Sequence, residues 1–147
     1  FNYRMTNIQA AIGLAQLAKI NKFIRKKRYI ANTYNFLLKN VSGITLPPEM
    51  PWAKNVFWMY SILVEDEFGI SRDELMKKLE KKGIETRTFF IPMNQQPVFH
   101  KMGLFKGEGY PVAESLSEKG LYLPSGSGLK KEQIKFICGS IKDIQES

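Results

Sequence analysis

The sequence predicts an α+β fold, in which a long N-terminal helix and several shorter helices cover a small, mainly antiparallel sheet. Apolar residues recur at helical spacing from about residue 6 to about residue 40. Three or four short segments rich in aromatic and β-branched residues follow, with helical patterns between them. These strands alternate with helices too little for a doubly wound parallel sheet, and the 147 residues amount to one domain.

The first helical pattern opens at a strong N-terminal signal. Thr6 and Gln9 stand three residues apart and fit a capping box, in which each side chain bonds the backbone N–H of the other residue. The apolar stripe then continues to about Asn40. That length predicts either one long bent helix or two consecutive helices that break near Asn21.

The middle of the chain predicts two strands, a proline-rich loop and a second capped helix. Residues 44–46 can form a short strand, after which three prolines within residues 47–51 enforce an extended loop. Residues 57–65 are rich in aromatic and β-branched side chains and give the strongest strand signal. Ser71 and the glutamate three residues later form another capping box, and the helix it opens should end at Gly83.

The last third of the chain predicts two strands and two helices. Residues 84–90 are expected to form a strand, and residues 92–102 an irregular segment with one helical turn. A proline in its first turn opens a helix over residues 111–119. Residues 121–123 form a short strand closed by a proline, and residues 130–145 form the closing helix, with isoleucines on one face.

Composition excludes several classes of protein. One cysteine, Cys138, rules out an internal disulfide framework and suits a reducing compartment such as the cytoplasm. With His100 as the one histidine, the chain cannot build a structural zinc site. No apolar run approaches the roughly 20 residues that span a bilayer, so we expect no membrane association. The net charge of +8 is densest in residues 25–28, which we interpret as a solvated helix face.

A polar cluster stands directly before the first helix. Asn2 and Arg4 would project from the turn at its N-terminus, where free N–H groups and the helix dipole favour anions. From the residues alone, two interpretations stay open. The cluster is either an anion-binding turn, or a turn-forming asparagine beside a solvated arginine.

Several motifs follow one another in the order of a known family. Residues 2–17 read Asn-Tyr-Arg-Met-Thr-Asn-Ile-Gln-Ala-Ala-Ile-Gly-Leu-Ala-Gln-Leu. Further along, residues 83–87 read Gly-Ile-Glu-Thr-Arg and residues 90–97 read Phe-Ile-Pro-Met-Asn-Gln-Gln-Pro. Residues 113–117 read Ala-Glu-Ser-Leu-Ser and residues 120–126 read Gly-Leu-Tyr-Leu-Pro-Ser-Gly. Together they resemble the DegT/DnrJ/EryC1/StrS sugar aminotransferases, fold-type-I enzymes that use pyridoxal phosphate, and the resemblance covers almost the whole chain.

The resemblance implies that residues 1–147 are the small C-terminal domain of such an enzyme, with the helix that links it to a large domain. The chain begins at Phe1 without an initiator methionine, and we expect a large N-terminal domain to precede it in the intact parent. That domain would supply the lysine that binds pyridoxal phosphate covalently and the acidic partner of its pyridine nitrogen. We therefore expect no catalytic residue in this fragment, and a homodimer in the intact parent.

The resemblance also implies four binding residues. Asn2 would reach across a dimer interface to the cofactor phosphate of the partner subunit, and Arg4 would strengthen that anion site. Arg87 and Asn94 lie in the segment that approaches the nucleotide sugar. Asn94 departs from the family, where many members have histidine; it can hydrogen-bond a hydroxyl or phosphate but cannot shuttle a proton near neutral pH. Lys130 departs as well, because serine or threonine often caps that helix.

The implied function is the amination of a nucleotide-linked keto-deoxy sugar for surface polysaccharide. The ending at residues 121–126 is most like that of members acting on a GDP-linked 4-keto-6-deoxy sugar, and the fragment alone should be inactive. Two alternatives stay open: a non-catalytic oligomerisation domain, or a basic module that binds nucleic acid or another polyanion through residues 25–28 and stacking aromatics. We do not expect nucleic acid as a partner, because packing explains those aromatics better. Without a large domain, Ile8, Ile12 and Leu17 should be exposed.

Overall fold

The computed structural model describes residues 3–147 and confirms the α+β class. Within that range one sheet has four strands in the order β1-β2-β4-β3, and each neighbouring pair is antiparallel. The strands are β1 (Ile44–Thr45), β2 (Tyr60–Val64), β3 (Arg87–Thr88) and β4 (Gly120–Leu123). The last strand in sequence, β4, therefore lies between β2 and β3.

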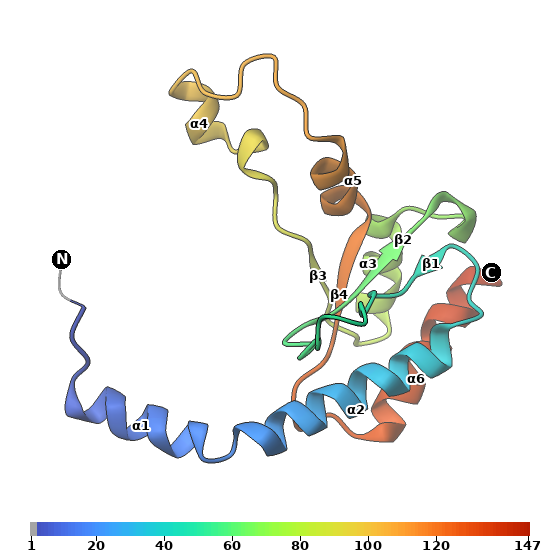
Figure 1. Ribbon diagram of the computed structural model, residues 1–147. Coiled ribbons are helices and arrows are strands. Elements are labelled where there is room, and N and C mark those ends of the chain that lie inside the picture. The colour runs from blue at the N-terminus through green and yellow to red at the C-terminus, as the bar shows by residue number, and fades with distance from the viewer. Residues whose placement is uncertain (1–2) are drawn as a thin grey trace.

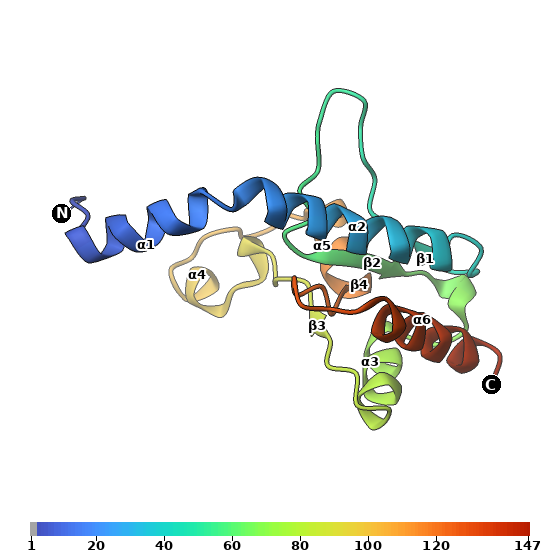
Figure 2. The same cartoon turned by 90° about the horizontal axis from the view of Figure 1, so that it is seen from below.

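Helices pack along this sheet and extend beyond it (Figure 1, Figure 2). The described helices and 3₁₀ turns are α1 (Asn7–Leu17), α2 (Ile20–Leu38), η1 (Asp66–Phe68), α3 (Arg72–Lys81), η2 (Met93–Gln95), α4 (Pro97–Lys101), α5 (Pro111–Lys119) and α6 (Lys131–Gln145). α2 and α6 lie side by side, and α3 packs against α6. α1 continues from α2 away from the sheet, while the connection that carries η2 and α4 forms a separate excursion (Figure 1).

The core lies between the sheet and helices α2, α3 and α6. Tyr34 of α2 and Tyr60 of β2 are fully buried, and their rings stack with centroids 4.5 Å apart. Alternate residues of β2 point into this core, as the two-residue period of a strand requires. The core also contains Leu75 and Leu79 of α3 and four isoleucines of α6, so the amphipathic stripes predicted for these helices are the buried ones.

The first helical pattern forms two helices rather than one. The break lies at Ala18 and Lys19, slightly before the predicted position near Asn21. There the Lys19 N–H bonds the Gln16 carbonyl at 3.0 Å, a tightened turn that interrupts the α-helical pattern. The predicted capping box of α1 is confirmed, because the Gln9 N–H donates to the Thr6 hydroxyl at 3.3 Å and the Thr6 N–H donates to Gln9 Oε1 at 2.9 Å.

Two predicted strands are shorter in the structure. β2 begins at Tyr60 because Phe57 adopts a left-handed conformation, with φ of 48°, which interrupts the extended chain. Of the predicted strand over residues 84–90, just Arg87–Thr88 forms a strand, paired with Tyr122 and Leu121 of β4. Strand length here depends on the partner, which the local sequence does not specify.

The remaining predicted elements agree closely with the structure. The Ser71 N–H donates to Glu74 Oε2 at 3.0 Å in the second capping box, and Gly83 follows α3 with φ of 76°. α5 has the predicted bounds, and α6 begins one residue after Lys130. At that start the Lys130 N–H donates to Gln133 Oε1 at 2.9 Å, so the lysine at the position where serine or threonine often caps this helix still has a local hydrogen-bond partner.

Candidate functional site

A hollow of about 380 Å³ lies beside Arg87, where β3 meets β4. We call it the Arg87 hollow, and its lining residues are Met59, Glu85, Arg87, Tyr122, Leu123, Pro124, Ser125 and Gly126. Arg87 is opposite Tyr122 in the sheet register. Its side chain is 74% exposed and lies 3.6 Å from Glu85, a loose pair in contact with solvent. The structure therefore brings the predicted substrate residue Arg87 together with the 121–126 motif.

The turn over residues 124–126 forms one wall of the Arg87 hollow and is attached to α2. Lys27 Nζ donates to the Ser125 carbonyl at 2.7 Å and to the Ser125 hydroxyl at 3.0 Å. The Tyr34 hydroxyl donates to the Pro124 carbonyl at 2.8 Å. Burial lowers the pKa of Lys27 from its ordinary value, because removal of water disfavours the charged form.

Sequence reasoning missed Lys27, because it treated residues 25–28 as a solvated face. The signal was the position of Lys27 within the apolar stripe of α2, three residues after Ile24 and four before Ala31. Arg28 of the same run is also engaged. Its guanidinium bonds both carboxylate oxygens of Glu49, at 2.6 and 3.1 Å.

Arg28 and Glu49 together hold the loop between β1 and β2 at its base. Arg28 also donates to the Asn55 carbonyl at 2.5 Å, and the Asn55 N–H donates to Glu49 at 2.9 Å. The loop projects well beyond the sheet, and Trp52 within it is 82% exposed (Figure 2). The hydrogen bond from Arg28 lowers the pKa of the Glu49 carboxyl, so the Arg28–Glu49 pair is ionised at neutral pH.

Asn94 is held inside the excursion between β3 and α5. It is buried, and its Nδ2 donates to Glu114 Oε1 at 2.6 Å. The same carboxylate oxygen accepts the Tyr110 N–H at 3.1 Å, at the start of α5. The side-chain nitrogen of Asn94 therefore links η2 to α5, a contact that no local sequence pattern indicates.

The predicted cofactor residues lie at the other end of the molecule. Asn2 falls outside the described residues. Arg4 is exposed and precedes α1, whose N-terminal end is the end away from the sheet (Figure 1). A helix of 11 residues is about 16 Å long, so within the described chain Arg4 and Arg87 belong to separate regions. The guanidinium of Arg4 beside a capped helix N-terminus is a donor set that suits a phosphate group.

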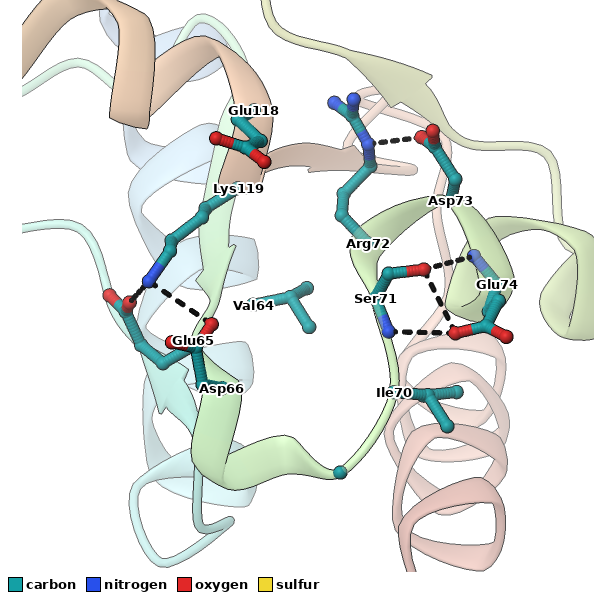
Figure 3. Close-up of a pocket in the computed structure, with 11 residues that line it drawn as sticks. Val64, Glu65, Asp66, Ile70, Ser71, Arg72, Asp73, Glu74, Glu118 and Lys119 are labelled. Carbon is teal, nitrogen blue, oxygen red and sulfur yellow. Dashed lines mark hydrogen bonds and ion pairs between the residues drawn. The ribbon is translucent and has the colours of Figure 1, made fainter. Parts of the chain in front are cut away.

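A second hollow, of about 420 Å³, lies between the ends of β2 and α5 and the start of α3 (Figure 3). Its charged side chains pair with one another: Lys119 Nζ lies 3.0 Å from Glu65 and 3.4 Å from Asp66. Arg72 donates to Asp73 and to the Gly120 carbonyl, the latter at 2.9 Å. Of the sequence-predicted site residues that the structure describes, none lines this hollow. Hydrogen bonds from Arg72 to the Ser117 and Gly120 carbonyls hold α3 to the α5–β4 junction, and the ion pairs of Lys119 hold the end of α5 to the segment after β2.

Within residues 3–147, no helix combines the length and the apolar character needed to cross a membrane.

Comparison with known proteins gives consistent matches along the chain. The model of the DegT/DnrJ/EryC1/StrS aminotransferase family matches residues 1–142. The chain is 40% identical over 145 residues to GDP-perosamine synthase of Escherichia coli O157:H7, covering 98% of the chain and 37% of that enzyme. It is 38% identical over 143 residues to GDP-perosamine synthase of Vibrio cholerae, covering 97% of the chain and 38% of that enzyme.

A solved structure shows the same fold. The crystal structure of S. venezuelae DesV in complex with a ketimine intermediate superposes with a TM-score of 0.87 at 28% identity. The match covers 98% of the chain and 38% of DesV. The chain thus spans a little over a third of the length of the relatives that it matches.

Proposed function

The chain belongs to the DegT/DnrJ/EryC1/StrS aminotransferase family, and from this premise we propose that it is the small C-terminal domain of an enzyme that aminates a nucleotide-linked keto-deoxy sugar. The observation that carries the proposal is the 38–40% identity to two GDP-perosamine synthases along 97–98% of the chain. Residues 122–126, from the motif most like that of members acting on a GDP-linked 4-keto-6-deoxy sugar, line one side of the Arg87 hollow. We propose a sugar of that class as the substrate.

Enzymes of this family use pyridoxal phosphate, which acts as an electron sink during transfer of the amino group. In our proposal this chain supports the cofactor instead of binding it covalently. Asn2 and Arg4 hold the phosphate of the cofactor in the partner subunit of a cytoplasmic homodimer. An amide N–H₂ and a guanidinium both donate to phosphate oxygens, and the dipole of α1 adds positive potential at its N-terminus.

Arg87 is proposed to bind the diphosphate of the nucleotide sugar. Its guanidinium is exposed, and its pair with Glu85 at 3.6 Å is loose enough for a diphosphate to replace. Asn94 lies in the same segment of the chain as Arg87, and we propose that its amide oxygen binds the substrate, since its amide nitrogen donates to Glu114. A neutral amide at this position orients a sugar hydroxyl but does not carry a proton.

The test uses the complete protein that contains this chain. Purified with pyridoxal phosphate and supplied with glutamate, it should convert a GDP-linked 4-keto-6-deoxy sugar into the amino sugar, detected by mass spectrometry. dTDP- and UDP-linked keto sugars serve as comparison substrates. If the protein retains its cofactor but aminates none of these sugars, the proposed function is wrong.

The 147-residue chain alone provides the complementary experiment. It should neither transaminate nor show a visible absorbance band that borohydride removes, because no lysine here has a recognisable covalent cofactor context. A band of this kind would contradict the division of roles. Titration with single-stranded nucleic acid tests the polyanion alternative, for which Lys27 and Arg28 would have to give up internal hydrogen bonds.

A further inference from the structure

Lys27 makes a contact that the proposed roles of the other residues do not use. It lies on α2, yet its ammonium bonds both the carbonyl and the hydroxyl of Ser125, which is 98 residues away in sequence. The ammonium is partly buried and its bonds are to uncharged oxygens. Removing it from water therefore costs free energy that no ion pair offsets. A cation that binds a turn lining a candidate binding hollow suggests a role beyond general stability.

We propose that Lys27 is a positioning residue for the nucleotide sugar, because its ammonium fixes the turn over residues 124–126 as a wall of the Arg87 hollow. The proposal rests on the proposed function, in which that hollow takes the substrate. The proposal links α2, through Lys27, to the turn that lines the Arg87 hollow. Lys27 itself does not line the hollow; it acts through Ser125, which does.

The turn needs such a link because its sequence is flexible. Residues 125–128 read Ser-Gly-Ser-Gly, and Gly126 has no neighbouring atom within 4 Å of where a Cβ would be. Two glycines among four small residues give the backbone wide conformational freedom. Without a fixed partner, the side of the hollow that faces Arg87 would adopt many conformations, and a ligand would have to order it on binding.

A second tether makes the role of Lys27 separable from folding. Tyr34 lies seven residues after Lys27 on the same face of α2, and its hydroxyl bonds the Pro124 carbonyl. Tyr34 is fully buried in the core, whereas the side chain of Lys27 is only partly buried where it contacts the turn. Loss of the Lys27 ammonium should therefore leave Pro124 attached and the domain folded, while Ser125 and Gly126 become mobile.

The test compares Lys27→Met with Lys27→Arg and with Lys26→Met in the complete enzyme. Lys26 is the matched control, because its ammonium lies 5.3 Å from the ring centre of Tyr29 and does not contact the turn. Lys27→Met should raise KM for the nucleotide sugar about tenfold, the scale of one hydrogen bond to a charged group, with kcat nearly unchanged. Lys27→Arg should restore most of the affinity, and Lys26→Met should behave as wild type.

Amide hydrogen exchange on the same variants tests the tether without substrate. The Leu129 N–H donates to the Gly126 carbonyl at 2.9 Å and reports on the order of the turn. Its exchange should accelerate in Lys27→Met but not in Lys26→Met, while the amides of β2 remain protected. Unchanged exchange at Leu129, or a wild-type KM in Lys27→Met, would overturn the proposal. Altered exchange in an enzyme that aminates no nucleotide sugar would instead show that the proposed function had failed.

Discussion

At the scale of single residues, Gly43 is the position where the backbone leaves least room for a side chain. Its φ is 67°, and a Cβ there would lie 2.0 Å from the backbone nitrogen of Phe68. Gly83 has a similar φ of 76° but no atom within 4 Å of a Cβ. We expect Gly83→Ala to cost about 1 kcal/mol of unfolding free energy for the left-handed conformation, and Gly43→Ala at least about 2 kcal/mol because the backbone must also move. Thermal or urea unfolding measures the difference, and equal losses would contradict the close approach.

Cys138 should be an unreactive thiol with a defined effect on alkaline stability. It is 2% exposed, and burial raises its pKa to about 12. Between the ordinary cysteine pKa of about 8.5 and this value, the unfolded thiol loses its proton while the folded thiol keeps it. Stability should therefore fall more steeply with rising pH in the wild type than in Cys138→Ala. Alkylation that is fast in the native protein would show that the thiol is accessible.

Asn2 and Arg87 should affect different ligands of the complete enzyme. Asn2→Ala should weaken retention of pyridoxal phosphate, because a hydrogen bond to a charged phosphate contributes about 1.5–3 kcal/mol, or roughly a tenfold to hundredfold change in affinity. Arg87→Ala should raise KM for the nucleotide sugar and leave cofactor binding nearly intact. A cofactor titration of both variants measures the separation.

Either variant can disprove its own assignment. If Asn2→Ala retains cofactor as well as wild type, the phosphate role does not belong to the turn before α1. If Arg87→Ala loses cofactor, the division between that turn and the Arg87 hollow is wrong.

At the scale of elements, α1 contributes no residue to the buried core of the part of the chain that the structure describes. None of its residues is buried, and Ile8, Ile12 and Leu17 are 73%, 60% and 63% exposed, as the sequence predicts. Apolar surface of this kind drives association. We expect the 147-residue chain to self-associate through α1, with sedimentation showing a concentration-dependent mass that Ile8→Lys and Ile12→Lys reduce. A strict monomer at high concentration with little binding of a hydrophobic dye would count against this.

Elements with local signals could be predicted from the sequence, and elements defined by distant partners could not. Thr6 and Ser71 each bond backbone groups within three residues, so their helices begin where the pattern indicates. β3 depends on β4, more than thirty residues later, and its predicted length was therefore wrong. The left-handed Phe57, which shortens β2, has no local signal because phenylalanine rarely adopts that conformation.

The candidate site shows the same distinction. The motifs located Arg87 and the 121–126 turn, but not the fact that they share one hollow, which follows from the β3–β4 pairing. The role of Lys27 could not be predicted from its basic run, because its partner Ser125 belongs to a turn that is distant in the sequence. Asn94 was expected to face a substrate, and the structure adds a link to Glu114 that ties it to α5. The roles of these side chains depend on contacts with residues that are distant in the sequence, and such contacts cannot be read from a single sequence.

At the scale of the whole molecule, the central place of β4 determines when the sheet can be completed during synthesis. A nascent chain leaves the ribosome from its N-terminus, and β2 and β3 emerge well before their common neighbour. Until residues 120–123 appear, one side of β2 offers unpaired N–H and C=O groups to any other strand. The excess of basic over acidic residues within residues 1–119, 18 against 11, would then matter in a way unrelated to ligands, because it makes neighbouring incomplete chains repel one another during that interval.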